Sequence, residues 1–234
     1  MAPPPHEDAL IDCCGLWFRY PGSDWVLRDC DLRVAVGERI LLRGPNGCGK
    51  STLLGILAHL QRPSRGHCRR CHETCQCVAL LSQQSDIDPS LPVQVRDVVA
   101  CGWRSTRPWW LPRGRGADRA VAGALATVGL ADEARNNPGA LSGGQQRRML
   151  IARSLVQGAR LLLFDEPLSG LDRDARQALA QVLEQTTGPG RAALVMVSHE
   201  VADCPLTFDR DLHFADGRLI PTAEAHCELV TDRD

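Results

Sequence analysis

Short apolar runs alternate along this chain with segments of helical periodicity. Segments 39–43, 161–164 and 192–197 have the length and apolar character of buried strands. Segments 50–60 and 174–185 instead repeat their apolar residues at the spacing of a helix. Strands that alternate with helices predict an α/β fold with a mostly parallel sheet.

Other segments add to this core. Segment 26–36 alternates as a strand does and predicts an antiparallel addition. Segments 93–100 and 117–128 predict helices, and a further helix opens at 141–145 and continues to Val156. Between the first two helices, the stretch 103–116 is rich in Pro, Trp, Arg and Gly, so we expect an irregular surface loop there.

Composition narrows the functional classes. The 234 residues are 44% hydrophobic and 24% charged, as in soluble globular proteins, and the net charge of -1 argues against broad nucleic-acid binding. There is no apolar run of about 18 residues, which a membrane-spanning helix would need. The first residues lack the basic and apolar regions of a signal peptide. We therefore expect the 11 cysteines to be reduced thiols rather than a disulfide framework.

The only lysine of the chain is Lys50, and the other 26 of the 27 basic residues are arginines. It belongs to segment 44–52, which fits the phosphate-binding loop pattern G-x-x-x-x-G-K-[ST] between a predicted strand and a predicted helix. A compact ammonium fits inside a narrow loop whose backbone N–H groups surround a phosphate, whereas the wide arginine fork does not. The sequence therefore predicts a nucleoside triphosphate site.

Two adjacent carboxylates, Asp165 and Glu166, follow the predicted strand 161–164. The carboxyl ends of parallel strands form the ligand edge of such a sheet. We expect Asp165 and the Ser51 hydroxyl to hold Mg²⁺, and Glu166 to polarise the water that attacks the γ-phosphate. The alternative is an acidic pair that only ends a strand, and the phosphate loop upstream makes this alternative the weaker one.

A second phosphate-binding element is predicted at Leu141-Ser142-Gly143-Gly144-Gln145. Ser142 and Gln145 have the spacing of a capping box, and the glycines leave N–H groups accessible at a helix N-terminus, where phosphates bind. A second such element in one chain suggests a site completed by a neighbouring subunit. With this motif the chain resembles the ABC-type ATPases over about residues 10–220.

The resemblance implies a fold. It is a P-loop NTPase with a RecA-like core, an antiparallel β addition and an inserted ABC α-helical subdomain. The core would comprise 10–82 and 157–220, the helical subdomain about 83–156, and the tails 1–9 and 221–234.

The resemblance also implies roles for particular residues. Tyr20 matches the aromatic residue that stacks on adenine, with Phe18 or Trp17 as alternatives. Gln83, or else its neighbour Gln84, matches the glutamine that contacts Mg²⁺ and the attacking water. His199 matches the histidine that reaches the γ-phosphate. The expected nucleotide contacts are therefore Tyr20, Gly44, Pro45, Asn46, Gly47, Cys48, Gly49, Lys50, Ser51, Thr52, Ser142, Gly143, Gly144, Gln145 and Asp172, the last on a loop that crosses to the partner.

The cofactors and partners follow from the same resemblance. Two identical or paired cassettes would enclose two ATP molecules with Mg²⁺. Integral-membrane permease subunits would hold the cassettes at the cytoplasmic face of the cell membrane, with an extracytoplasmic substrate-binding protein acting through the permease. No nucleic acid is expected as a partner.

Segment 81–99 is similar to the corresponding region of zinc and manganese importer ATPases, although Ser82, Gln84, Leu91 and Gln94 depart from their pattern. Divalent-metal import is therefore our expectation. The alternatives are iron-chelate import and a soluble ATPase of iron–sulfur cluster assembly, the latter suggested by the cysteines.

Cysteine and histidine also gather at 67–77. Cys68 and Cys71 have the spacing of one half of a zinc site, whereas Cys75 and Cys77 are too close together for the usual second half. The alternative is a strand and turn in which cysteine replaces small apolar residues.

Overall fold

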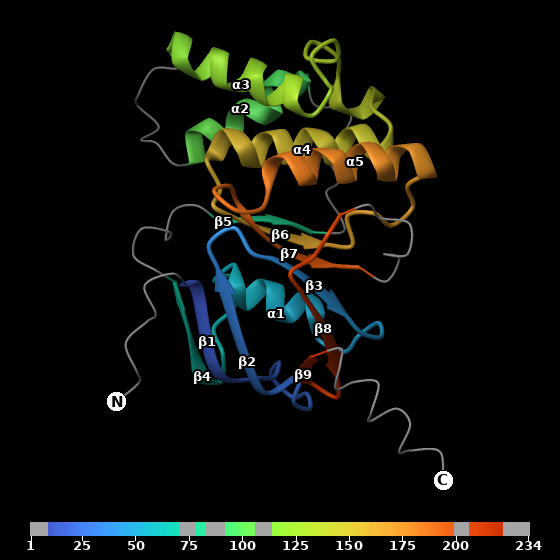
Figure 1. Cartoon of the computed structure of the whole chain (residues 1–234). Coiled ribbons are helices and arrows are strands. Elements are labelled where there is room, and N and C mark those ends of the chain that lie inside the picture. Colours follow the sequence, from blue (N-terminus) through green and yellow to red (C-terminus); the bar gives the residue numbers. More distant parts are fainter. Residues whose placement is uncertain (1–8, 71–77, 83–91, 106–113, 199–205, 222–234) are drawn as a thin grey trace.

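A six-stranded sheet forms the centre of the molecule (Figure 1). The computed structural model describes residues 9–70, 78–82, 92–105, 114–198 and 206–221. The strands follow the order β5-β6-β7-β3-β8-β9, and all neighbours are parallel except β8 and β9. Their bounds are β3 Arg39–Arg43, β5 Val78–Leu81, β6 Leu161–Asp165, β7 Ala193–Val197, β8 Arg210–Ala215 and β9 Arg218–Pro221. The predicted mostly parallel sheet is confirmed.

The central strands are apolar throughout because both faces of the sheet are covered. Ile40 and Leu42 of β3 face the helix α1, Lys50–Leu57, whereas Leu41 between them belongs to the core on the opposite face. Residues of β6 and β7 alternate in the same way. Each strand therefore contributes to two separate hydrophobic cores.

The antiparallel addition is a three-stranded sheet in the order β2-β1-β4. It consists of β1 Ala9–Phe18, β2 Leu27–Ala35 and β4 Arg65–Arg70. Helix α1 lies between this sheet and the six-stranded sheet, as Figure 1 shows, and its buried leucines share one core with both sheets. The helix that begins at Lys50 is thus held from two sides.

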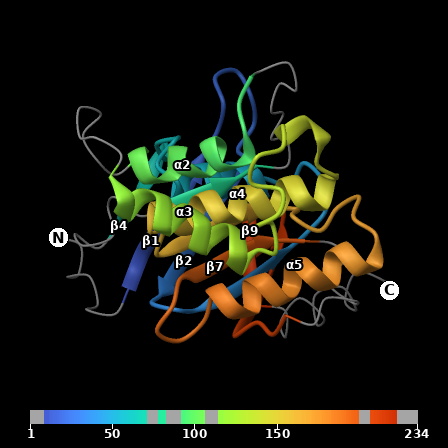
Figure 2. The same ribbon diagram turned by 90° about the horizontal axis from the view of Figure 1, so that it is seen from above.

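Four helices cover the other face. They are α2 Val95–Ser105, α3 Arg115–Thr127, α4 Gly143–Gln157 and α5 Arg173–Thr186, with a short 3-10 helix at Pro138–Ala140 before α4. Helix α4 contacts α2, α3 and α5 (Figure 2). In the described part of the chain, none of the helices combines the length and the apolar character needed to cross a membrane.

The surface loop expected at 103–116 is wrong in its first part, because α2 continues to Ser105 and Trp103 packs against the core. Gly102 allows this path. A Cβ atom there would lie 2.0 Å from the Arg153 carbonyl oxygen of α4, so α2 and α4 approach more closely than any other residue would permit. Gly102 therefore permits the close packing of these two helices.

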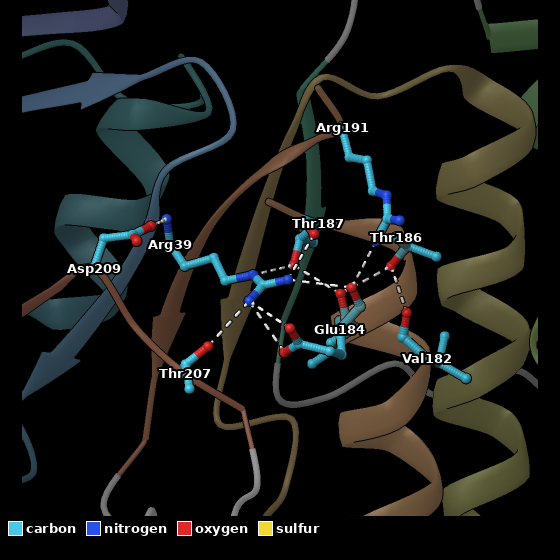
Figure 3. A network of polar contacts seen from close by, with 9 residues as sticks. Arg39, Val182, Glu184, Thr186, Thr187, Arg191, Thr207 and Asp209 are labelled. Atoms are coloured by element: carbon cyan, nitrogen blue, oxygen red, sulfur yellow. Dashed lines mark hydrogen bonds and ion pairs between the residues drawn. The ribbon is translucent and has the colours of Figure 1, made fainter. Parts of the chain in front are cut away.

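A buried arginine joins the sheet to α5 (Figure 3). The Arg39 guanidinium donates to both carboxylate oxygens of Glu184 at 3.0 Å, to Thr187 Oγ1 at 3.0 Å and to the Thr187 carbonyl oxygen at 2.7 Å. It also donates to Thr207 Oγ1 at 3.3 Å. Asp209 accepts from the Arg39 backbone N–H at 2.8 Å. This network fixes the start of β3 against the end of α5.

Candidate functional site

The loop between β3 and α1 has a backbone that only glycine allows. Gly44, Gly47 and Gly49 all have positive φ angles of 145°, 78° and 116°. A Cβ atom on Gly44 would lie 2.4 Å from the Phe214 carbonyl oxygen, and one on Gly49 would lie 2.9 Å from Val26 Cγ1. Neighbouring strands therefore force the loop to turn tightly toward the start of α1.

Lys50 is a buried cation at the first position of α1, with 6% of its surface exposed. Its Nζ donates to the carbonyl oxygens of Gly44 and Pro45, each at 2.7 Å. No carboxylate of the described residues forms an ion pair with it, the first turn of α1 has no acidic residue, and no side chain caps the helix. A buried positive charge at an uncapped helix N-terminus is a place where a phosphate is strongly stabilised.

Tyr20 lies beside the first turn of α1, near Thr52. Its hydroxyl is 3.1 Å from Thr52 Oγ1, and Gln61 Nε2 donates to it at 3.2 Å. Tyr20 is 42% exposed, although its ring packs edge-on against the buried Phe18, whereas Trp17 is half-buried and packs edge-on against Trp25. Of the three aromatic residues considered from the sequence, Tyr20 is therefore the most exposed and the most accessible to a planar ligand.

The carboxylate of Asp165 ends β6 and that of Glu166 follows it, at the same edge of the sheet as the phosphate loop. Val197 of β7 is paired with Leu42 of β3 on one side and with Asp165 on the other. Asp165 and Leu42 are therefore two strands apart at one level, a separation of about 10 Å from the usual strand spacing. Glu166 has a φ angle of 51°, and its N–H donates to the Val197 carbonyl oxygen at 3.0 Å.

A pocket of about 160 Å³ adjoins Asp165. Ser82, which precedes the predicted Gln83, lines this pocket together with residues of α4 and the loop after β6. Gln83 itself and His199 lie outside the described residues, as does the rival Gln84, so their roles stay predictions. The described neighbours Ser82 and Ser198 both lie near this edge, since the Ser198 N–H donates to the Leu42 carbonyl oxygen at 3.3 Å.

The second phosphate-binding element has the predicted capping box. Gln145 N–H donates to Ser142 Oγ at 3.3 Å, and Ser142 N–H donates to Gln145 Oε1 at 2.9 Å. Asp172 caps α5 in a similar way, by accepting from the Ala175 N–H at 2.8 Å. Helix α4 lies on the face of the sheet opposite to α1 (Figure 1), so one chain does not bring Ser142 and Lys50 to the same face.

Arg147 joins the surroundings of Glu166 although the sequence analysis did not select it. Its Nη1 donates to the Pro167 carbonyl oxygen at 2.6 Å and also to that of Ser169. Burial lowers the pKa of Arg147, and the Glu166 charge opposes this shift. One signal in the sequence could have pointed to Arg147. It is a basic residue less than two turns from the N-terminus of a helix, and that N-terminus was already predicted to bind phosphate.

The donor set fits Mg²⁺ and a triphosphate. Ser51 is an exposed hydroxyl in the first turn of α1, and Asp165 is a half-buried carboxylate at the same sheet edge. Hydroxyl and carboxylate oxygens are ligands that Mg²⁺ accepts. The zinc site considered at 67–77 is not tested in this way, because Cys71, Cys75 and Cys77 lie outside the described residues. Within the described ranges, no three potential metal ligands come together.

Comparison with known proteins gives consistent results. The ABC transporter family model matches residues 27–169. The aliphatic sulfonates import ATP-binding protein SsuB of Rhodopseudomonas palustris is 35% identical over 92% of this chain and 74% of its own length. SsuB 2 of Pseudomonas aeruginosa is 37% identical over 85% of this chain and 69% of its own.

The fold is also similar to that of solved ABC transporter components. The structure of cbiO1 from Clostridium perfringens, part of an ABC transporter complex, superposes with a TM-score of 0.78 at 23% identity. The match covers 97% of this chain and 94% of the other. The predicted P-loop fold with its ABC helical part is thereby confirmed. The chain belongs to the ABC transporter family, as an ATPase that uses ATP with Mg²⁺.

Proposed function

We propose that this chain is the ATP-hydrolysing subunit of an ABC importer. The observation that carries the proposal is the buried Lys50 ammonium, whose partners among the described residues are the Gly44 and Pro45 carbonyl oxygens and the Cys48 sulfur, with no carboxylate, at the sheet edge that also bears Asp165 and Glu166. A phosphate supplies the missing negative charge, and a carboxylate pair two strands from Leu42, about 10 Å away at the same level of the sheet, can reach the far end of a triphosphate.

Each residue then has a role in hydrolysis. Lys50 and the N–H groups of the loop bind the β- and γ-phosphates, and the exposed Tyr20 ring stacks on the base. Ser51 and Asp165, with Gln83, hold Mg²⁺, which neutralises charge on the phosphates when bound. Glu166 accepts hydrogen bonding from the attacking water and orients it, and His199 contacts the γ-phosphate.

The complete site is formed between two chains. The N-terminus of α4, with Ser142, lies across the sheet from the Lys50 loop of its own chain. Such a helix end attracts phosphate and therefore binds the γ-phosphate held by a partner cassette. ATP stabilises the closed pair because it contacts both chains, and hydrolysis removes these contacts.

Membrane partners would convert this cycle into transport. The cassette pair binds integral-membrane permease subunits at the cytoplasmic face of the cell membrane, and an extracytoplasmic protein delivers the substrate. Import is supported by the curated relatives named above, which are import ATP-binding proteins.

The transported substrate is the finer part of the proposal. The relatives act in import of aliphatic sulfonates, so a small organic sulfonate is our first candidate. Divalent-metal import, expected from segment 81–99, receives no support from these relatives. It is kept as a second candidate because Val95, Asp97 and Val98 of α2 match the metal-importer pattern. Residues 83–91 of that segment lie outside the described part.

Steady-state ATP hydrolysis tests the enzymatic part of the proposal. We expect Glu166→Gln to bind ATP, to lose about 100-fold or more in kcat and to accumulate as a dimer, because the water is no longer activated. Glu184→Gln is the matched control, since it removes a half-exposed carboxylate at the far end of α5. Equal turnover of Glu166→Gln and the control would remove Glu166 from catalysis.

Uptake assays test the substrate. Cells that lack this chain would be supplied with a labelled alkanesulfonate, or with labelled zinc or manganese, and compared with cells that express it. Uptake of sulfonate that depends on Glu166 supports the first candidate. Uptake of metal alone would replace it with the second.

A further inference from the structure

The Arg147 side chain attaches the loop between β6 and α5 to the start of α4 through hydrogen bonds. Arg147 of α4 donates through Nη1 to the carbonyl oxygens of Pro167 and Ser169, so a single nitrogen bridges two backbone groups of this loop. Pro167 directly follows Glu166 in the chain, and Ser169 lies three residues after it. The guanidinium thus helps to fix the course of the backbone directly after the Glu166 carboxylate.

The rest of the loop is fixed at its ends. Glu166 N–H donates to the Val197 carbonyl oxygen at 3.0 Å, and Ser169 N–H donates to the Glu166 carbonyl oxygen at 3.3 Å. At the far end Asp172 caps α5. Between these ends, Arg147 is the described side chain that connects the loop to another helix, through Pro167 and Ser169.

Glu166 is held in a backbone conformation that it would rarely adopt alone. Its φ angle is 51°, in the left-handed region that is unfavourable for a residue with a side chain. Such a conformation persists only where surrounding contacts determine it. The Arg147 bonds to the next residues are among those contacts.

The starts of α4 and α5 also pack directly together. A Cβ atom on Gly144 would lie 3.1 Å from the Ala175 Cβ and 3.5 Å from Leu171 Cδ2. Close packing of this kind makes the two helix ends move as one unit. Arg147 extends the unit to Glu166, because its positive charge also interacts with that carboxylate.

We propose that Arg147 is a positioning residue that ties the Ser142 end of α4 to Glu166 of the same chain. The proposal rests on the proposed function, in which Ser142 contacts one ATP and Glu166 acts on the other. An ATP bound at the α4 N-terminus thereby orders the carboxylate that serves the second site. Hydrolysis at the two sites is coupled through this side chain.

The test compares Arg147→Gln and Arg147→Lys with Arg148→Gln in ATP hydrolysis. Arg148 is the matched control, because it follows Arg147 on α4 but donates to the Val128 carbonyl oxygen at 3.1 Å, away from the loop. We expect Arg147→Gln to lower kcat about 10- to 100-fold, the loss typical of a misplaced reacting group, with KM for ATP changed less than about threefold. The Hill coefficient for ATP should fall toward 1.

Arg147→Lys should recover a large part of kcat, since an ammonium can also donate to two carbonyl oxygens. Rescue by lysine separates positioning from a general loss of folding, which the melting temperature monitors independently. If Arg147→Gln does not fold, the Lys variant carries the test, with an intermediate kcat expected.

The proposal is overturned if Arg147→Gln, folded and active, keeps the kcat and Hill coefficient of the Arg148→Gln control. It is also overturned if Arg147→Gln and Arg148→Gln lose kcat to the same extent. Failure of the proposed function looks different: the unmodified protein would then hydrolyse no ATP, or its turnover would not depend on Glu166.

Discussion

Removal of the Arg39 side chain should destabilise the fold more than any other single arginine change outside the nucleotide site. Arg39 is 7% exposed and donates to groups on two other segments of the chain, to Glu184 and Thr187 at the end of α5 and to Thr207. Arg39→Met keeps most of the apolar stem and removes the guanidinium. The substitution therefore isolates the polar network of Figure 3.

The magnitude follows from the exposure of the partners. Thr187 is completely buried, and a buried acceptor that loses its donor costs about 1–3 kcal/mol. The Glu184 side chain is 50% exposed, so solvent screens this ion pair and it contributes about 0–1 kcal/mol. The expected loss in free energy of unfolding is about 1–4 kcal/mol, or about 2–16 °C in melting temperature for a chain of this length.

Urea and thermal unfolding, followed by circular dichroism without nucleotide, measure this loss. Arg191→Met is the matched control, because Arg191 donates to the Glu184 carbonyl oxygen at 2.9 Å from an exposed position. We expect the control to lose less than about 1 kcal/mol. The reasoning is refuted if Arg39→Met and Arg191→Met unfold at the same urea concentration.

Three further predictions concern the loop and the cysteines. Gly44→Ala should weaken ATP binding at least tenfold in an equilibrium titration, because its Cβ would meet the Phe214 carbonyl oxygen at 2.4 Å; unchanged affinity would contradict this. Alkylation of Cys48 should inhibit hydrolysis, with ATP protecting, and full activity after complete modification would argue against it. Mild oxidation with copper phenanthroline should cross-link Cys13 and Cys68, whose sulfurs are 2.9 Å apart. Peptide mapping without reductant should detect the linked peptides, and their absence would contradict the prediction.

The sequence predicted the centre of the sheet well for a physical reason. Strands β3, β6 and β7 are covered on both faces, so their sequences are continuous apolar runs that stand out. The phosphate loop and the capping box were also predictable, because their function depends on local geometry that few residue types can adopt.

Strands at the margins were harder to predict. The sequence of β4 is Arg-Gly-His-Cys-Arg-Arg, and its residues are exposed or half-buried because β4 lies at the edge of its sheet. No apolar pattern therefore marks this strand in the sequence. The end of α2 was missed because the stretch 103–116 is rich in Pro, Trp, Arg and Gly, and the sequence does not reveal that Gly102 packs against the Arg153 backbone of α4. Arg147 was missed because its partners are backbone carbonyl oxygens, which the sequence does not reveal.

The central claim is that each ATP site combines the Lys50 loop of one chain with the Ser142 helix end of another. Lys50→Ala and Ser142→Arg chains should each fail to hydrolyse ATP or to form ATP-dependent dimers alone. Mixed together, they form pairs in which one site retains both native elements, so we predict that ATP-dependent association and part of the hydrolysis return. If the mixture stays as inactive as its components while the unmodified protein is active, the shared site is contradicted.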